Sequence, residues 1–381
     1  MRYIEYKRII FISEMRNPRT SGSSTQIMTR NLLYGFSKIS EHLVFVAVIE
    51  KLEDAKDIRE YYKELTSDIY FVIENSKDKT NVLKRQFVWL ADTFKNHFDR
   101  LPCELKKTFG HETVLVSQSP GLDAALLCKE LKQKNPNIYY VQYWGDPLAL
   151  SLITPQQYNA KRILLKLIEK RLHRFADKIV YGTESLFSAE LQLFPEIKKK
   201  TKACDVSFMP DAIDVRNPSN ILKFGYFGNY YSVIRDICPL YEAFRQISDA
   251  HLVICGSSDL RLKSTDRIKV LDRIPQDSVE REEAKIDVEV CVLNRVGIQI
   301  PGKIFYHTNT KKHILVLTDG PIFDTIEAEL QKSNRFIICR NEQNEIEKTV
   351  RAIISGEYND VEYDRYYYSP EKISRQIVQR I

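Results

Sequence analysis

The sequence predicts an α/β protein built from two doubly wound domains. Short apolar runs alternate with helical patterns along the whole chain, which is typical of parallel sheets covered on both faces. The alternation starts again after a turn-rich stretch in the middle, Phe208–Asp214 followed by Asn217–Asn220. A length of 381 residues suits two hydrophobic cores better than one.

Each half carries a series of predicted strands separated by helical stretches such as Ser24–Ser37 and Leu122–Lys134. In the first half the strands are Arg8–Ser13, Leu43–Val48, Ile69–Ile73, Thr113–Gln118, Ile138–Tyr143 and Lys178–Gly182. In the second half they are Leu222–Phe227, His251–Cys255, Ile268–Leu271, Val288–Leu293, Ile314–Leu317 and Phe336–Cys339. We therefore predict domains at 1–215 and 216–358, with a C-terminal segment at 359–381.

The C-terminal segment is predicted to end in a helix. Ser369 followed by Pro370 is a good helix start, because proline fits the first helical position. Ile373, Ile377 and Ile381 repeat at four-residue spacing, so the helix has one apolar face.

Composition excludes several classes of protein. The longest apolar runs fall short of the roughly 20 residues that a membrane span needs, and Met1–Ser13 contains Arg2, Lys7 and Arg8 without a cleavage site, unlike a signal peptide. The seven cysteines form no C-x-x-C pair, which favours reduced thiols in a cytosolic protein and argues against structural zinc. A net charge of +6 is mild but concentrated, with seven Lys/Arg against two acids in residues 161–178.

The most informative motif is Pro301-Gly302-Lys303-Ile304-Phe305, just before the strand Ile314–Leu317. It is predicted to open a short helix whose unpaired N–H groups favour an anion. Gly302 would let the backbone approach a ligand closely. Lys303 opposes the helix dipole unless an anion lies between the two. The alternative is a surface turn with a solvated lysine.

Two common nucleotide-binding motifs are absent from the sequence. There is no G-x-G-x-x-G fingerprint and no G-x-x-x-x-G-K-[ST] loop, which argues against a dinucleotide enzyme and a P-loop NTPase. The loop after the first strand contains Gly22 and Ser23 before a helix. These residues either contact a phosphate or sugar or simply cap the helix.

Several strings together resemble one enzyme family in order and spacing. Met209–Asp214 resembles an "i-P-n-G-i-D" linker, Phe224–Asn229 a "Y-x-G-n/r" strand end, and Pro301–Phe305 the start of "P-s-K-l-f-E-Y". The chain resembles GT-B-fold glycosyltransferases, nearest to the retaining family-four enzymes that build bacterial polysaccharides. The resemblance implies two Rossmann-like domains facing across a cleft, with the acceptor bound by the first and the nucleotide sugar by the second. It also implies that the C-terminal helix crosses back to the first domain.

The resemblance implies three groups of site residues. The catalytic candidates are Asp146, Arg235 and Lys303. The donor-binding candidates are Gly228, Asn229, Gly256, Ile274, Gly302, Ile304 and Tyr306. The candidates for an acceptor or phosphate loop are Gly22, Ser23 and Trp144. Tyr306 stands where the family often has a glutamate that contacts the ribose, and it either hydrogen-bonds a ribose or packs in the core.

The expected function is transfer of a sugar from a nucleotide donor, most simply a UDP-sugar, to a glycan or lipid-linked acceptor in bacterial surface polysaccharide synthesis. The sequence has no D-x-D motif, which fits metal-independent chemistry without a cofactor. A retaining mechanism needs no strong protein nucleophile, whereas an inverting one would use Asp146 as general base. The alternatives are a non-catalytic GT-B subunit that partners another transferase or binds a glycan, and a sugar-nucleotide epimerase.

A cytoplasmic location is expected, with the inner face of the plasma membrane as an option. Within residues 161–175 one predicted helix face carries Leu164, Ile168, Leu172 and Phe175, and another carries Arg162, Lys166, Lys170 and Arg174. Either the apolar face covers the sheet of an ordinary surface helix, or the basic stripe rests on anionic lipid. No nucleic-acid-binding motif is present.

Overall fold

The computed structural model describes residues 6–18, 24–73, 101–106, 112–119, 121–150, 159–212, 221–320 and 323–381. The chain divides into two compact units, of which the first is Met1–Ser207 with Ser369–Ile381 and the second is Phe208–Tyr368. The sequence analysis drew these boundaries at 215/216 and 358/359. Part of the turn-rich stretch between the halves, residues 213–220, lies outside the described residues.

The first unit contains a fully parallel sheet with the described strand order β3-β2-β1-β4-β5-β6-β7. The order reverses between β1 and β4, which is the topological switch point of a doubly wound sheet. Its central strands β2, β1, β4 and β5 are largely buried on both faces, as a sheet covered by helices on both sides requires. The strands are β1 (Tyr6–Met15), β2 (Ser40–Ile49), β3 (Asp68–Ile73), β4 (Thr113–Ser119), β5 (Tyr139–Trp144), β6 (Lys178–Tyr181) and β7 (Thr201–Ala203).

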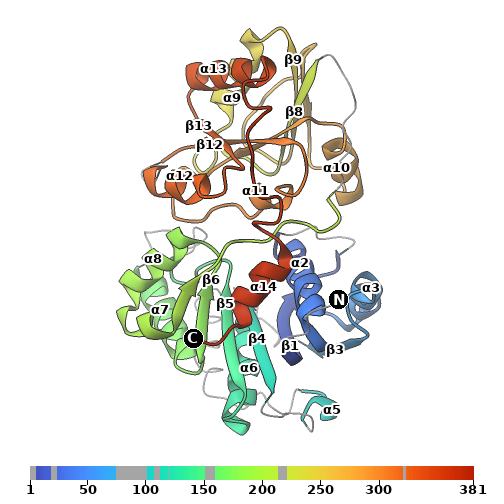
Figure 1. Ribbon diagram of the computed structural model, residues 1–381, viewed down its shortest axis with the longest axis vertical. Helices are drawn as coiled ribbons and strands as arrows, with labels where there is room; N and C mark the ends of the chain where they lie inside the picture. Colours follow the sequence, from blue (N-terminus) through green and yellow to red (C-terminus); the bar gives the residue numbers. More distant parts are fainter. Residues whose placement is uncertain are drawn as a thin grey trace. The chain divides into compact units, whose positions relative to one another are not determined.

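Helices pack against this sheet and against one another (Figure 1). Helix α2 contacts β1 and β2, and α6 contacts β1, β4 and β5. The helices of the unit are α2 (Ser24–Ile39), α3 (Ala55–Tyr62), α5 (Cys103–Lys106), α6 (Leu122–Lys134), α7 (Asn159–His173), α8 (Glu184–Leu193) and α14 (Pro370–Val378), with 3₁₀ turns η1 (Leu52–Asp54) and η3 (Pro195–Lys200).

Helix α14 returns to the first unit and lies against α2. The hydroxyl of Ser369 caps the helix by accepting a hydrogen bond from the Lys372 amide at 3.3 Å. At Gly35 the two helices approach so closely that a Cβ atom would lie 2.2 Å from Pro370 O. At the other end, Lys178 Nζ donates to the carbonyls of Gln376 and Gln379 at 2.6 and 2.8 Å, which satisfies the last turn of α14.

The second unit contains a parallel sheet with the described order β10-β9-β8-β11-β12-β13. Its core includes an edge-to-face pair of Phe224 and Phe244, with ring centroids 5.1 Å apart. The strands are β8 (Leu222–Phe227), β9 (Ala250–Cys255), β10 (Ile268–Leu271), β11 (Val288–Val292), β12 (His313–Thr318) and β13 (Ile337–Arg340). The helices are α9 (Cys238–Gln246), α10 (Gln276–Glu283), α11 (Lys303–Tyr306), α12 (Phe323–Gln331) and α13 (Gln343–Ile354).

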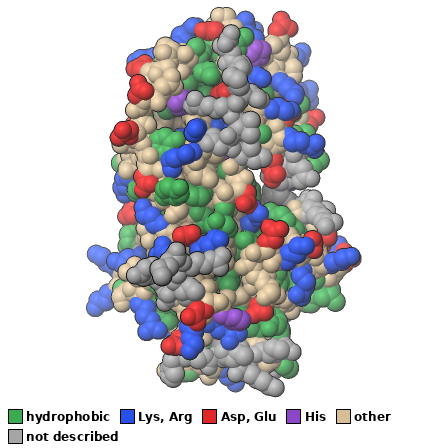
Figure 2. Space-filling model, turned by 45° about the vertical axis from the view of Figure 1, so that its right-hand side comes forward, with side chains coloured by type: hydrophobic (Ala, Val, Ile, Leu, Met, Phe, Trp, Pro, Cys, Tyr) green, Lys and Arg blue, Asp and Glu red, His purple; other side chains and the backbone are tan. Residues whose placement is uncertain are grey.

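The predicted fold class is confirmed: two doubly wound parallel sheets, with the last helix packed on the first domain. The sequence analysis missed β7, because Thr201-Lys202-Ala203 has no apolar run. None of the helices in the described ranges combines the length and the apolar character that a membrane crossing requires. Figure 2 shows Lys and Arg side chains interspersed with Asp and Glu over the face that it presents.

Candidate functional site

The carboxyl end of β8 is held tightly against the end of β9. The amide of Gly228 donates to Cys255 O at 2.8 Å. Gly256 lies so close to this turn that a Cβ atom there would be 2.1 Å from Gly228 O. Only glycine fits at Gly256, so the two strand ends form one continuous backbone ledge.

Lys303 lies against this ledge. Its ammonium donates to Phe227 O and lies 4.3 Å from the centroid of the Tyr226 ring, a cation–π contact. A Cβ atom at Gly228 would be 2.7 Å from Lys303 Nζ, so the glycine leaves room for the ammonium group. An ammonium has three donor protons and can therefore serve an additional acceptor.

Arg235 contacts the turn that follows the same strand. Its Nη1 donates to Asn229 O at 3.3 Å and its Nη2 to Asn294 Oδ1 at 2.7 Å. The side chain of Asn229 in turn accepts the Ser257 amide at 3.1 Å. Five predicted site residues therefore meet within the second unit: Gly228, Asn229, Gly256, Lys303 and Arg235.

The short helix predicted at Pro301–Phe305 is confirmed as α11. It is a single turn of four residues, so it has little macrodipole, and Lys303 contributes the positive charge at this edge. Gly302 has an ordinary helical φ of −55°. A Cβ atom there would be 3.2 Å from Tyr306 Oη, so the absence of a side chain accommodates the tyrosine ring.

The remaining donor-side candidates are mostly buried. Ile304 is fully buried and Tyr306 is 4% exposed, so both side chains lie within the second unit. Ile274 is half-buried and packs on the small apolar cluster of Phe227, Cys255 and Ile286, directly beneath the ledge.

The first-unit candidates are placed less completely. Gly22 and Ser23 lie outside the described residues. Trp144 is 1% exposed, and its indole N–H donates to Gln142 Oε1 at 3.3 Å within the core. Asp146 is half-buried in the loop that follows β5, at the carboxyl edge of the first sheet.

The loop containing Asp146 is anchored by Glu169, a residue of α7 that the sequence analysis did not select. The fully buried Glu169 carboxylate accepts the amides of Leu148 at 3.4 Å and Ala149 at 3.0 Å. Burial raises the pKa of Glu169 to about 7, although these two amide donors oppose the shift. In the sequence, an acidic residue on the apolar side of a predicted helix was the pattern that could have identified Glu169.

Glu190 of α8 is a second buried carboxyl group in the first unit. Burial is the main cause that raises its pKa to about 9, and the charge of Glu169 adds to the shift. The neighbouring Tyr181 hydroxyl partly opposes this shift. Burial also lowers the pKa of nearby His173 to about 3, so its imidazole is neutral. Its ring lies edge-to-face to Trp144 at 5.3 Å.

Three potential metal ligands lie together in the second unit. Carboxylate oxygens of Glu283 and Glu289 and a ring nitrogen of His307 lie within 4.8 Å of one another. His307 Nε2 is 3.7 Å from Glu283 Oε2. The charges of Lys303 and Lys312 also act on both carboxyl groups. Because cations already accompany these carboxylates, the arrangement fits a buried ion-pair cluster better than a divalent-metal site. In the sequence, an acidic residue, Glu289, inside an apolar strand was the signal.

Burial and the cations oppose each other within this cluster. Burial acts to raise the pKa of Glu283, but His307 and the two lysines hold that pKa below its ordinary value. Burial likewise acts to lower the pKa of His307, and Glu283 and Glu289 together raise it. Glu283 and His307 therefore each favour the charged form of the other.

No protein-family model matches the chain, and no curated protein does. Solved structures match it over nearly its full length at low identity. HepE of Anabaena, in complex with UDP and glucose, has a TM-score of 0.58 at 11% identity, covering 98% of this chain and 96% of HepE. The chain has the GT-B fold.

Two further structures show the same likeness. The lipopolysaccharide outer core galactosyltransferase WaaB has a TM-score of 0.53 at 13% identity, covering 97% of this chain and 95% of WaaB. The UDP-GlcNAc 2-epimerase of Neisseria meningitidis, bound to UDP-GlcNAc, has a TM-score of 0.51 at 11% identity, with 98% of each chain covered. At these identities the likeness shows the fold and leaves the activity to the site residues.

Proposed function

We propose that the protein is a glycosyltransferase that moves a sugar from a nucleotide donor, most simply a UDP-sugar, to a glycan or lipid-linked acceptor. The observation that carries the proposal is the meeting of Lys303 and Arg235 at the carboxyl end of β8. In doubly wound sheets this edge is where ligands bind. A nucleoside diphosphate leaves with increasing negative charge, which fixed cations and amides stabilise.

The proposed donor site uses Lys303 and Arg235 as electrostatic groups and the ledge of Gly228, Asn229 and Gly256 for close backbone approach. Ile274 and Gly302 would lie beside the nucleotide. Ile304 and Tyr306 would act from beneath by packing, since both are buried. UDP or a UDP-sugar in structures of the same fold supports this choice of donor.

We propose a metal-independent, retaining reaction. The lack of a D-x-D motif in the sequence supports the first point. In such a reaction the leaving diphosphate helps to deprotonate the acceptor. The first unit would contribute Asp146 and the loop with Gly22 and Ser23 on the acceptor side, whereas Trp144 would act only by packing, because it is buried. NMR of the product anomer tests this assignment: an inverted configuration would make Asp146 the general base instead.

The pathway proposal is synthesis of bacterial surface polysaccharide at the cytoplasmic face of the membrane. Ile163 and Leu167 of α7 are 61% and 52% exposed, and Arg162 and Lys166 are exposed beside them. Exposed apolar and basic side chains on one helix favour weak attachment to anionic lipid. Flotation with phosphatidylglycerol vesicles at low salt should recover the protein, and Ile163→Ser with Leu167→Ser should reduce recovery. No recovery of the wild type would exclude attachment.

Calorimetric titration with UDP and GDP tests the donor site. Lys303→Gln should weaken nucleotide binding about 30- to 100-fold, in line with loss of a charge-assisted contact. Lys332→Gln, an exposed lysine of the same unit, should leave the affinity unchanged. If the wild type binds neither nucleotide, the donor-site proposal fails.

The second candidate function is a non-catalytic GT-B subunit or glycan-binding partner of another transferase. The buried Tyr306, at a position where the resembled family often has a ribose-binding glutamate, favours it. Nucleotide binding without release of nucleoside diphosphate in the presence of varied acceptors would support this alternative. Epimerisation of UDP-GlcNAc at C2, detected by proton NMR, would instead identify an epimerase.

A further inference from the structure

The carboxyl ends of three strands of the second sheet are joined by one side chain, that of Arg295, which follows β11. Its Nε donates to Asp319 Oδ2, directly after β12, at 3.0 Å. Its Nη2 donates to Asp236 Oδ2, in the loop after β8, at 3.4 Å, and its Nη1 donates to Ser232 O in the same loop at 3.3 Å. Arg295 therefore crosslinks the loop that carries Arg235.

The two arginines at this edge have different kinds of acceptor. Arg295 meets two carboxylates. In the described part of the chain Arg235 donates to two neutral groups, Asn229 O at 3.3 Å and Asn294 Oδ1 at 2.7 Å. There its Nε has no hydrogen-bond partner. Because its acceptors are neutral, the Arg235 guanidinium retains its full charge for a ligand anion.

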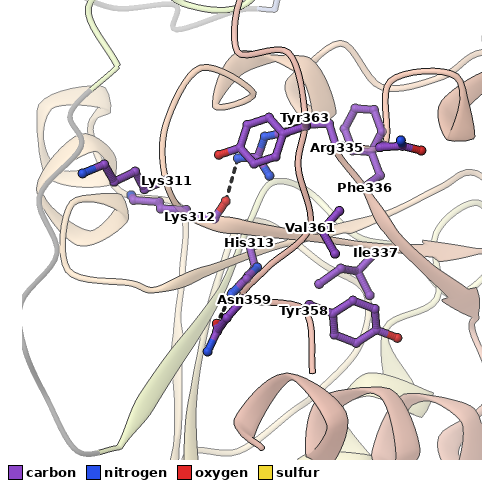
Figure 3. Close-up of a pocket in the computed structure, with 11 residues that line it drawn as sticks. Lys311, Lys312, His313, Arg335, Phe336, Ile337, Tyr358, Asn359, Val361 and Tyr363 are labelled. Atoms are coloured by element: carbon purple, nitrogen blue, oxygen red, sulfur yellow. Dashed lines mark hydrogen bonds between the residues drawn. The ribbon is translucent and has the colours of Figure 1, made fainter. Parts of the chain in front are cut away.

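A third arginine of this unit, Arg335, shows the opposite arrangement. Figure 3 shows it beside Tyr363, with its hydrogen bond to the Lys312 carbonyl. Its guanidinium donates to four backbone carbonyls, those of His307, Thr308, Thr310 and Lys312. The Arg335 side chain is 5% exposed and holds the backbone together, whereas Arg235 is half-buried and has donors to spare.

Asp236 is the carboxylate best placed to compete for Arg235. The two residues are consecutive in the chain, and the bonds Arg235–Asn294 and Asp236–Arg295 join the same two pairs of neighbours. One Asp236 oxygen, Oδ1, accepts the Cys238 amide at 2.9 Å. The other, Oδ2, is held by Arg295. The Asp236 side chain is 19% exposed, and an unpaired carboxylate at that depth attracts the nearest cation.

Asp319 depends less on the guanidinium group than Asp236 does. Its Oδ1 accepts the Gly320 amide at 2.8 Å, and its Oδ2 accepts Asn341 Nδ2 at 3.4 Å in addition to Arg295. Loss of the guanidinium would therefore leave Asp236 Oδ2, rather than an oxygen of Asp319, without a donor.

We propose that Arg295 is a positioning residue of the donor site. By pairing with Asp236 it withholds that carboxylate from Arg235. The Arg235 guanidinium then stays on Asn229 and Asn294, with its charge available to the diphosphate of the nucleotide. This inference rests on the proposed function, which assigns Arg235 to the diphosphate.

NMR of the Arg235 side chain in nucleotide-free, full-length protein tests the pairing itself. With ¹⁵N-labelled arginine, the Nε–Hε signal is assigned by its loss in Arg235→Lys. Arg295→Gln should shift this signal, because the guanidinium turns to Asp236. Adding Asp236→Asn, which keeps an acceptor for the Cys238 amide, should return the signal to its wild-type position. A signal that does not move in Arg295→Gln, or does not return in the double variant, would overturn the proposal.

Calorimetric titration with UDP measures the consequence for binding. Arg295→Gln should weaken UDP binding about tenfold, because Arg235 is then partly neutralised. The double variant with Asp236→Asn should recover to within about threefold of the wild type. Arg351→Gln, which removes an exposed arginine of α13, is the matched control and should leave both the affinity and the Arg235 signal unchanged.

The double variant separates positioning from a purely structural role. If Arg295 served only to hold the loops together, removal of Asp236 as well would weaken UDP binding further, and that result would contradict the proposal. If the wild type binds no nucleotide, the donor-site proposal fails, but the Arg235 signal still decides whether Arg295 withholds Asp236.

Discussion

The two units of the molecule place their inward-facing carboxyl groups in different surroundings. In the first unit burial raises the pKa of both Glu169 and Glu190, and the charge of Glu169 raises that of Glu190 further. In the second unit Glu283 is accompanied by His307 and by Lys303 and Lys312, and its pKa is lowered. Glu289 of the second unit has the same accompanying cations, but burial raises its pKa to about 7. The depth of burial and the accompanying cations therefore together decide the charge of each carboxyl group.

The largest expected effect concerns Glu190 and pH. A raised pKa in the folded state contributes stability that is fully present below the unfolded value of 4.5 and is lost as pH rises through the folded value of about 9. From pH 5 to 8, the folding equilibrium of the first unit should weaken by up to about tenfold per pH unit. Glu190→Gln should remove most of this slope in denaturant titrations. Glu184→Gln, exposed on the same helix, should retain it; equal slopes for both variants would contradict the raised pKa.

The next effect concerns His307. Replacing it with Gln leaves the half-buried Glu283 with only the two lysines, so the second unit should lose about 2 to 3 kcal/mol of unfolding free energy. His251→Gln, half-buried in β9, is the control and should cost less. Urea unfolding followed by hydrogen exchange of β11 measures the difference, and an unchanged midpoint would show that the pair contributes nothing.

The pH dependence of this loss sharpens the comparison. The lowered pKa of Glu283 contributes stability above 4.5 that is lost as pH falls through its folded value. The raised pKa of His307 contributes stability below 6.5 that is lost as pH rises through its folded value. The wild type should therefore exceed His307→Gln most clearly between about pH 4.5 and 6.5, opposite to the steady decline expected from Glu190.

A smaller effect is expected at Glu169. Glu169→Gln keeps one acceptor oxygen but presents an amide group to the other backbone N–H, at a cost of about 1 to 2 kcal/mol. Hydrogen exchange at Leu148 and Ala149 should accelerate. The Gly182 amide, bonded to Trp144 O at 2.9 Å, is an internal control and should exchange as before. Unchanged exchange at Ala149 would exclude Glu169 as the anchor of the Asp146 loop.

The smallest effect is expected at Asn294, which positions Arg235 through the 2.7 Å bond to its side-chain oxygen. Asn294→Ala should weaken UDP binding about fivefold, since about 1 kcal/mol of orientation is lost. Gln331→Ala, exposed on α12, should have no effect. If Asn294→Ala binds UDP as the wild type does, Arg235 does not need this partner at the donor site.

Sequence patterns predicted the strands and helices better than the residues of the site. Apolar runs located β8, β10 and the helix α6 at the observed residues, because buried strands and helices have strong apolar periodicity. The short strand β7 was not predicted, because it is defined by its pairing with β6 rather than by its composition. In α7 the predicted apolar residues Ile168 and Leu172 are buried together with Leu165, whereas Leu164 is only half-buried.

The site was predictable only where a local motif exists. Gly228 and Lys303 follow strand ends within recognisable strings, and the structure brings them together. Glu169 and the Glu283–His307 pair were missed because their partners come from distant segments of the chain. A single sequence gives no sign of which cation will reach a given carboxylate.

The return of α14 to α2 makes the second unit an insertion within the first, joined to it by two chain crossings. During synthesis on a ribosome the second unit can fold as soon as Tyr368 emerges, whereas the first must wait for the residues that fill the groove beside Gly35. Until then its α2 surface is uncovered, so the earlier-made half of the protein should be the later one to reach its native state and the one that chaperones engage.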